Sequence, residues 1–116
     1  MQATSMEKYK RPRLANVKKM SLEFPDRCHY WEEEIKLMKV GDIAKVANEH
    51  ERFWVVVKEI NPKYIIGEVN NILIMSPSPQ LGEKIIFKRE NIYETWDLEE
   101  FKAYYKSQQE DKETAS

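Results

Sequence analysis

The stretch that decides the fold covers residues 52–60 and reads Arg52-Phe53-Trp54-Val55-Val56-Val57-Lys58-Glu59-Ile60. Successive side chains of a β-strand point to opposite faces, so Phe53, Val55 and Val57 share one face. Trp54 and Val56 lie on the other face. Both faces are therefore largely apolar, which a sheet with one face in water does not tolerate. We expect a cover over the second face: an N-terminal strand, a helix or a partner protein.

Three further strand-like stretches flank this run and are separated by turn residues. They cover residues 40–46, 64–69 and 84–88. Turn signals at such regular spacing are typical of small β architectures. Residues 72–75 are apolar enough to tuck into the structure or to form a short edge strand. The pattern predicts a mainly β (α+β) fold with a small antiparallel barrel of about five strands.

Glycines mark special backbone positions in these stretches. Gly67 interrupts a strand and predicts a bend or bulge of the kind that closes small barrels. Gly41-Asp42 and Gly82-Glu83 each precede a strand. The repeated glycine-acid pair predicts two equivalent barrel corners.

A capped helix is expected after the barrel. Asp97 as N-cap and Glu100 three residues later form a capping box. Trp96 and Phe101 are placed to form a hydrophobic staple, and the apolar stripe of the helix is expected to pack on the barrel. We predict a helix over residues 98–106 and a frayed polar tail over residues 107–116.

Ahead of the barrel, the sequence predicts an arm, a strand and a short helix. Residues 1–13 are polar, basic and aperiodic, which indicates a flexible arm, so the single domain covers residues 14–106. Residues 19–24 alternate between apolar and polar side chains, which predicts a half-buried strand. Four apolar residues at helical spacing predict one face of a helix capped by Asp26. They are Cys28, Trp31, Ile35 and Met38.

The bulk composition fits one globular domain in a reducing compartment. A chain of 116 residues with 41% apolar and 34% charged residues is long enough for a single core. Its single cysteine excludes an internal disulfide and favours an intracellular protein of the cytoplasm, the nucleus or the interior of a virus particle. No apolar run approaches the roughly 20 residues that cross a membrane, so no membrane partner is expected.

Charge is distributed unevenly along the chain. The formal net charge is −1, yet residues 1–20 carry six bases and one acid, a net charge of +5. Residues 95–116 carry six acids and three bases, a net charge of −3. A basic arm of this kind can dock on an acidic partner while the rest of the chain stays near neutral.

Several short segments within about residues 39–93 resemble the bacterial YegJ-like family of domains of unknown function and similar short uncharacterised proteins of large DNA viruses. The segments are Gly41-Asp42-Ile43-Ala44-Lys45-Val46, Glu51-Arg52-Phe53-Trp54-Val55, Ile66-Gly67-Glu68-Val69-Asn70-Asn71 and Gly82-Glu83-Lys84-Ile85-Ile86-Phe87. The viral version fits better, because Ile72-Leu73 stand where the bacterial pattern has Asp-Pro. The resemblance implies an SH3-like barrel and no assigned chemistry.

Residues that carry catalysis or bind metals are sparse. Cys28-His29 and the distant His50 fall short of the paired ligand spacing of zinc sites. Nothing in the sequence places a base beside a nucleophile, and no glycine-rich phosphate loop is present. Three consecutive glutamates at positions 32–34 indicate a solvated helix face. We expect no metal, no cofactor and no enzyme activity.

A protein-interaction or assembly module is the function that the sequence favours. Aromatic side chains and arginines are enriched in interface hot spots. We expect a protein partner, or self-association, through a barrel edge or an aromatic face that contains Trp54, Arg52, Tyr64, Trp31 and Tyr93. The alternative is a nucleic-acid-associated protein, since small barrels bind nucleic acid through aromatic faces beside basic residues. Its contacts would come from the arm and one barrel face: Lys8, Lys10, Arg11, Arg13, Lys18, Lys19, Lys45, Lys88 and Arg89.

Overall fold

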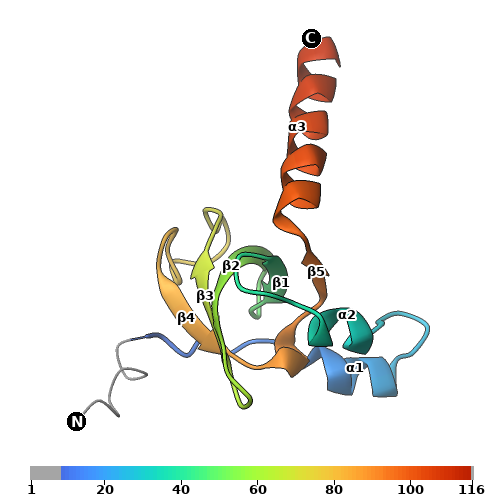
Figure 1. The fold of residues 1–116 in the computed structure, drawn as a ribbon, viewed down its shortest axis with the longest axis vertical. Helices are drawn as coiled ribbons and strands as arrows, with labels where there is room; N and C mark the ends of the chain where they lie inside the picture. Colours follow the sequence, from blue (N-terminus) through green and yellow to red (C-terminus); the bar gives the residue numbers. More distant parts are fainter. Residues whose placement is uncertain (1–8, 116) are drawn as a thin grey trace.

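The computed structural model describes residues 9–115, with side chains described over residues 9–108. An antiparallel sheet has short helices beside it and one long helix that projects from it (Figure 1). In chain order the elements are α1 (Val17–Glu23), α2 (Glu32–Lys36), β1 (Ile43–Ala47), β2 (Arg52–Ile60), β3 (Ile65–Val69), β4 (Lys84–Phe87), the 3-10 helix η2 (Arg89–Asn91), β5 (Glu94–Trp96) and α3 (Leu98–Ala115). No helix in this part of the chain is both long and apolar enough to cross a membrane.

The sheet has the strand order β4-β3-β2-β1-β5, and every neighbouring pair is antiparallel. This arrangement confirms the predicted α+β class and an antiparallel sheet of about five strands, although the fifth strand is β5, which no sequence pattern predicted. The predicted closure into a barrel is wrong, because β4 and β5 remain the two edges of an open sheet. The backbone of Lys10 pairs with Ile85 on the β4 edge. Ile35 and Met38 pack into the core, so helical residues fill space that a closed barrel would enclose with strands.

The core lies on the inner face of the sheet. Phe53, Val55 and Val57 are buried there, as their alternation predicts. A Cβ atom at Gly67 would lie 2.9 Å from the Phe87 ring, so this glycine permits close packing between strands. The register shift lies on the facing strand β2, between Val57 and Glu59, rather than at the glycine itself.

Two equivalent turns precede β1 and β4, as the repeated glycine-acid pairs predict. Gly41 and Gly82 have φ angles of 98° and 85°, which side chains rarely adopt. In each turn the acid accepts a hydrogen bond from the backbone N–H three residues before it, at 2.9 Å for Asp42 and 2.8 Å for Glu83. In each turn the glycine N–H also donates to a strand carbonyl at 2.8 Å. The same local chemistry therefore starts both strands.

Helix α1 occupies the segment predicted as a strand over residues 19–24, so that prediction is wrong. The Asn16 side chain caps the helix by accepting a hydrogen bond from the Lys19 N–H at 2.9 Å. Val17 is buried, whereas Leu22 is 78% exposed, so the apolar alternation does not mark a buried face. An alternation over six residues is too short to outweigh a capped helix start.

Helix α2 is shorter than predicted. It covers five residues and begins after Trp31, and Asp26 does not cap it. Ile35 and Met38 are buried as their spacing predicts, whereas Trp31 is 45% exposed. The three glutamates of α2 are exposed, as predicted. Helical spacing therefore identified buried positions only where the backbone is helical or follows directly after the helix.

Helix α3 begins at its predicted residue and continues beyond its predicted end. The Asp97 carboxylate accepts hydrogen bonds from the N–H groups of Glu99 and Glu100, at 2.8 Å and 3.4 Å. The Glu100 carboxylate accepts one from the Asp97 N–H at 3.3 Å, which completes the capping box. The helix reaches Ala115 and projects away from the sheet along the longest axis of the molecule (Figure 1). The fraying predicted for residues 107–116 stays a prediction.

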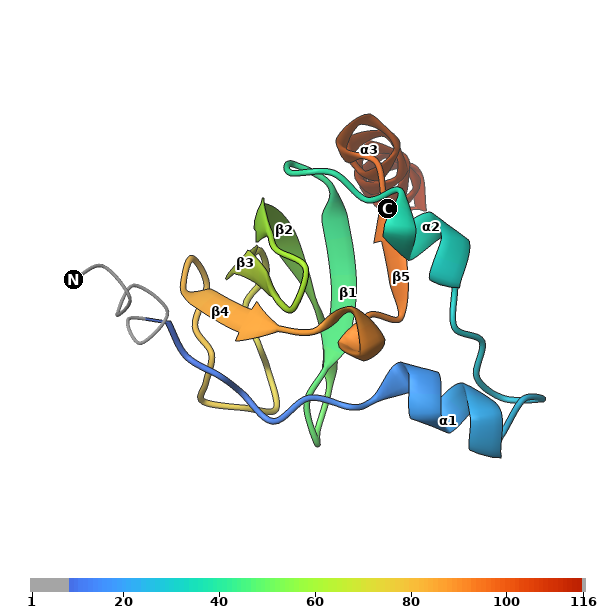
Figure 2. The same ribbon diagram turned by 60° about the horizontal axis from the view of Figure 1, so that its bottom comes forward.

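The described part of the N-terminal arm is anchored beside β4 (Figure 2). The Lys10 carbonyl accepts a hydrogen bond from the Ile86 N–H at 2.9 Å, and the Lys10 Nζ lies 2.9 Å from the Glu83 carboxylate. Hydrogen bonds from the Gln80 N–H and from Lys10 lower the pKa of Glu83. Lys10 is therefore joined to the β4 edge by backbone pairing and by an ion pair. The rest of the predicted arm, residues 1–8, lies outside the described residues.

Residues 72–75 form neither a strand nor a buried insertion. Leu73 packs against the core, but Ile72, Ile74 and Met75 are mostly exposed. Their neighbours in the connection from β3 to β4 are held by hydrogen bonds to the β1–β2 hairpin. The prediction for this segment is therefore wrong except at Leu73.

Candidate functional site

The aromatic and arginine residues predicted to bind a partner lie in three separate hollows. Trp54 lines a groove between β2 and α3, and Tyr64 lines a furrow beside β4. Arg52, Trp31 and Tyr93 line a pocket beside α1. The five residues therefore do not form one continuous hollow, although Arg52 and Trp54 lie on the same face of β2. Arg52 begins the nine-residue strand β2 and Tyr64 lies in the turn that follows its far end, so the length of the strand, roughly 25 Å at the rise of an extended chain, separates them.

The aromatic groove is our name for the hollow lined by Trp54, Ile72, Leu81, Phe101 and Tyr105, with a volume of about 690 Å³. The Trp54 ring lies edge to face against Phe101, with ring centres 5.0 Å apart, and its centre is 6.2 Å from that of Trp96. The first turns of α3 thus provide the cover that was expected over the second apolar face of β2, the face that carries Trp54. The cover is partial, because Trp54 beneath the helix is still only half-buried and Tyr105 on the helix is 57% exposed.

One wall of the aromatic groove is fixed to the backbone of Trp54. The Trp54 N–H donates to the Asn71 side-chain oxygen at 2.7 Å, and the Asn70 N–H donates to the Trp54 carbonyl at 2.8 Å. These two bonds satisfy the backbone of β2 where β3 ends. They hold the exposed Ile72 at the rim of the groove.

The Glu51 carboxylate holds the adjoining part of the same connection. It accepts hydrogen bonds from the N–H groups of Ile74 and Met75, at 2.9 Å and 2.6 Å, and from the Ser76 hydroxyl at 3.0 Å. Burial alone would raise the pKa of Glu51, but these hydrogen bonds outweigh it and lower the pKa. Glu51 therefore supports the apolar rim more strongly in its ionised form than in its protonated form.

The charged residues that line the aromatic groove are both basic. Lys102 and Lys106 follow one another at i and i+4 on α3 and are exposed. Lys45 lies over the Trp54 ring at 4.7 Å from its centre and within 4.0 Å of the Glu94 carboxylate. The hollow thus combines an apolar floor with a positively charged rim.

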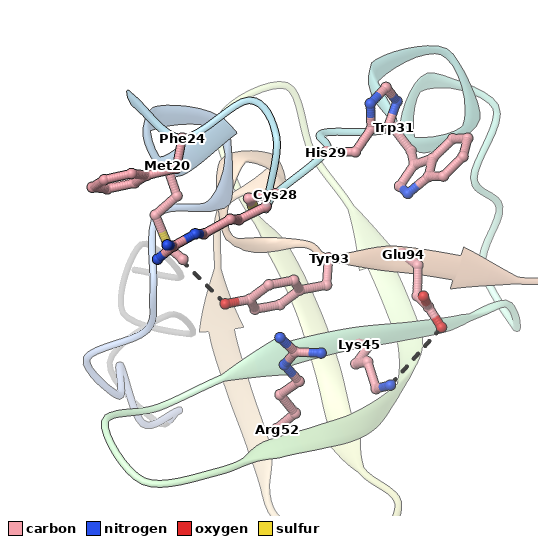
Figure 3. Close-up of a pocket in the computed structure, with 10 residues that line it drawn as sticks. Met20, Phe24, Cys28, His29, Trp31, Lys45, Arg52, Tyr93 and Glu94 are labelled. Atoms are coloured by element: carbon pink, nitrogen blue, oxygen red, sulfur yellow. Dashed lines mark hydrogen bonds and ion pairs between the residues drawn. The ribbon is translucent and has the colours of Figure 1, made fainter. Parts of the chain in front are cut away.

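The Tyr93 pocket, of about 330 Å³, lies between α1 and the outer face of the sheet (Figure 3). The Arg52 guanidinium stacks over the Tyr93 ring at 4.5 Å from its centre. The Tyr93 hydroxyl points to the Met20 sulfur of α1 at 4.0 Å, and Phe24, the residue directly after α1, lies near Met20. The pocket is therefore lined mainly by the segment that follows α1 and by the sheet, with Met20 as its one residue from α1.

Cysteine and histidine meet in this pocket without forming a reactive pair. The Cys28 thiol donates to the Val17 carbonyl at 3.8 Å. The His29 ring lies beside Trp31, with ring centres 4.2 Å apart, and points away from the thiol (Figure 3). No three side chains of His, Cys, Asp or Glu are grouped as metal ligands in the described part of the chain. His50 is exposed in the β1–β2 hairpin.

The basic residues predicted to bind nucleic acid are also divided. Arg11, Arg13 and Lys88 gather in one hollow, which we call the cationic furrow, together with Tyr64 and the unpredicted Lys63. A neighbouring hollow contains Lys18 and Arg89. The other predicted bases pair with acids, namely Lys10 with Glu83, Lys19 with Glu23 and Lys45 with Glu94. Lys8 lies outside the described residues.

Sequence reasoning missed several residues of these hollows. The apolar stripe that contains Phe101 and Tyr105 was recognised, but it predicted packing on the barrel. No pattern in the sequence near residues 98–115 predicts that α3 leaves the sheet after its first turns. Lys102, Lys106 and Lys63 were missed because an isolated lysine carries no pattern of its own.

No protein-family model, curated protein or solved structure matches the chain. The resemblance to the YegJ-like family and to the viral proteins therefore stays a prediction.

Proposed function

We propose that the chain is a non-catalytic protein-interaction module that binds an acidic, amphipathic segment of a partner protein in the aromatic groove. The observation that supports the proposal best is the continuous aromatic surface of Trp54, Phe101 and Tyr105, which the described residues cover only in part. Large exposed apolar patches next to a hollow are typical of binding sites. Aromatic anchors supply large contact areas with few rotatable bonds.

The chemistry of the partner segment follows from the charge at the rim. Lys102 and Lys106 border an otherwise uncharged lining. A segment with apolar anchors and flanking Asp or Glu side chains complements both features. Complementary charge accelerates encounter and rejects basic competitors.

A second copy of the chain is a poorer occupant than a different protein. The acidic residues 110–113 have the right charge, but residues 106–116 contain no apolar side chain larger than alanine. That stretch therefore offers no anchor for the groove. The exposed Ile72, Ile74 and Met75 offer anchors with no acid beside them in the sequence, and the nearby Glu51 carboxylate is occupied by the N–H groups of Ile74 and Met75.

The test is an NMR titration of the isotope-labelled full chain with a synthetic peptide that carries Leu and Phe anchors beside glutamates. A matched peptide has lysine in place of each glutamate. We expect the indole N–H signals of Trp54 and Trp96 to shift with the acidic peptide, while the signal of Trp31 stays in place as an internal control. No shift, or an equal response to the lysine peptide, would contradict the proposal.

Two neighbouring tyrosines provide the matched variants. Tyr105→Ser removes a groove residue and should weaken peptide binding about tenfold or more, the loss expected at an interface hot spot. Tyr104 is 47% exposed on the same helix but contacts Trp96 outside the groove lining, so Tyr104→Ser should change affinity less than about twofold. Sedimentation of the free chain decides the remaining alternative, since a concentration-dependent dimer that Tyr105→Ser dissolves would assign the groove to a second copy.

The finer fold assignment is a proposal as well. We propose that the sheet is related to the SH3-like class implied by the resemblance, with its two edges left apart. The support is a meander of β1 to β4 followed by a return of β5 to pair with β1.

A further inference from the structure

The cationic furrow brings together segments that are far apart in the sequence. Arg11 and Arg13 follow the residue that pairs with β4, Lys63 lies in the turn between β2 and β3, and Lys88 follows β4. All four side chains are exposed and line one hollow of about 590 Å³, with Tyr64 half-buried in its lining. The pairing of the arm with β4 thus creates a basic surface that no local segment contains.

The positive charge of the furrow is not neutralised by nearby acids. Among the described residues, none of the four basic side chains has a carboxylate within ion-pair distance. Glu90 is the single acid in the lining, and its carboxylate accepts a hydrogen bond from the Asn16 side-chain amide. A chain of net charge −1 therefore concentrates positive charge here.

The basic surface continues into the adjacent hollow, which shares Lys63 and Lys88 with the furrow. Lys18, Lys36 and Arg89 bring the number of bases to seven against two acids. The second acid, Glu32, lies 3.6 Å from Lys18 and 3.8 Å from Lys36, and Lys36 also lies 3.7 Å from Glu33, so part of the positive charge of this second hollow is paired. The half-buried Tyr30 adds a second aromatic side chain.

We propose that this surface binds the phosphate backbone of single-stranded nucleic acid, with Arg11, Arg13, Lys63 and Lys88 on phosphates and Tyr64 beside an unpaired base. Successive basic side chains along a groove follow a polyphosphate backbone, and aromatic rings beside them stack on bases of any sequence. A paired base does not offer its face to a tyrosine, which favours a single strand over a duplex. The furrow shares no residue with the aromatic groove, so the two sites can be tested separately.

The experiment measures fluorescence anisotropy of a labelled oligothymidylate with the full chain at several salt concentrations. Each phosphate neutralised on a single strand contributes about −0.7 to the slope of log K against log salt, so four contacts predict a slope of about −2.8. Affinity should then fall about 50-fold between 50 and 200 mM salt. Arg11→Gln with Arg13→Gln, and separately Lys63→Gln with Lys88→Gln, should each reduce the slope to about −1.4.

The matched control is the double variant Lys102→Gln with Lys106→Gln, which removes the same charge from the aromatic groove. Its slope should equal that of the unmodified chain, and circular dichroism should show all variants folded. Tyr64→Leu should weaken binding several-fold without a change in slope. The proposal would be overturned by no binding at 50 mM salt, by equal slopes in all variants, or by tighter binding of the matching duplex. It would also be overturned if heparin competed equally well and Tyr64→Leu had no effect on oligothymidylate binding, because the surface would then be a nonspecific polyanion site.

Discussion

The two faces of β2 have the same apolar pattern but very different surroundings. On the inner face Phe53, Val55 and Val57 are almost completely buried within one core. On the outer face Trp54 and Val56 are only half-buried, under the first turns of a helix that then leaves the sheet. Hydrophobic patterning therefore predicts that a face will be covered, but it does not predict which segment or protein covers it. The inner face is covered by the chain itself, whereas the outer face keeps exposed apolar surface in the groove, which we propose binds a partner.

Truncation of one residue on each face gives the largest expected contrast. Phe53→Ala should lower the free energy of unfolding by about 3–5 kcal/mol, because it empties a closed core. Trp54→Ala should cost about 1–2 kcal/mol, mainly through its edge-to-face contacts with Phe101 and Trp96. Urea denaturation followed by circular dichroism measures both changes.

The same pair can break the comparison. Equal losses would make the outer face a second core instead of a binding surface. In the peptide titration Trp54→Ala should also abolish binding, and an unchanged affinity together with an unchanged melting temperature would make Trp54 an idle surface residue.

The entry of α3 over the outer face depends on its cap. Asp97→Ala removes the side-chain acceptor for two backbone N–H groups and should cost about 1 kcal/mol. Asp26, the acid that was predicted as a cap but caps no helix, is the control, and Asp26→Ala should change stability by less than about 0.5 kcal/mol. Similar effects of the two substitutions in urea denaturation would show that α3 does not depend on this capping box.

The smallest expected effect is a change in the pH dependence of stability caused by Glu51, which holds the connection beside the aromatic groove. The folded pKa of Glu51 lies below its ordinary value of 4.5, so the carboxylate stabilises the fold above that pH. This contribution should be lost as the pH falls through the lowered pKa. Glu51→Gln should therefore show a smaller decrease in melting temperature between pH 5 and pH 3 than the unmodified chain.

Glu49 provides the control for this pH dependence. It is exposed in the same hairpin and makes no side-chain hydrogen bond within the described residues. Glu49→Gln should leave the acid response unchanged. Glu83 also has a lowered pKa, so part of the acid-induced decrease in melting temperature should remain in every variant. If Glu51→Gln and the unmodified chain lost the same melting temperature between pH 5 and pH 3, the decrease would come entirely from other carboxylates.

Predictions from the sequence were most successful where one segment settles its own conformation. The alternation of residues 52–60 located the central strand, and the turns at Gly41 and Gly82 use hydrogen bonds within four residues. The capping box at Asp97 is equally local. In each case the interacting groups are close neighbours in the chain, so their pattern can be read directly.

Predictions failed where the deciding contact is distant in sequence. One failure was local instead: residues 19–24 alternate, yet the side chain of Asn16 caps the Lys19 N–H three residues later and starts a helix. The aromatic residues predicted to form one site lie in three hollows. The prediction failed because the sequence does not show how the strands and helices that carry these residues are arranged. Arg11 joined Lys63 and Lys88 only through the backbone pairing of Lys10 with β4, more than 70 residues away.

Sequence patterns were sufficient for four of the five strands, for the turns before β1 and β4, for the capped start of α3 and for the requirement for cover on both faces of β2, since periodicity and short-range hydrogen bonds express these features locally. Only the tertiary structure decided that the sheet stays open, that α3 covers the outer face in part, and that a basic surface forms along the arm and β4. Those outcomes depend on which distant segments occupy a shared edge or face, and packing and backbone pairing settle that competition over the whole chain.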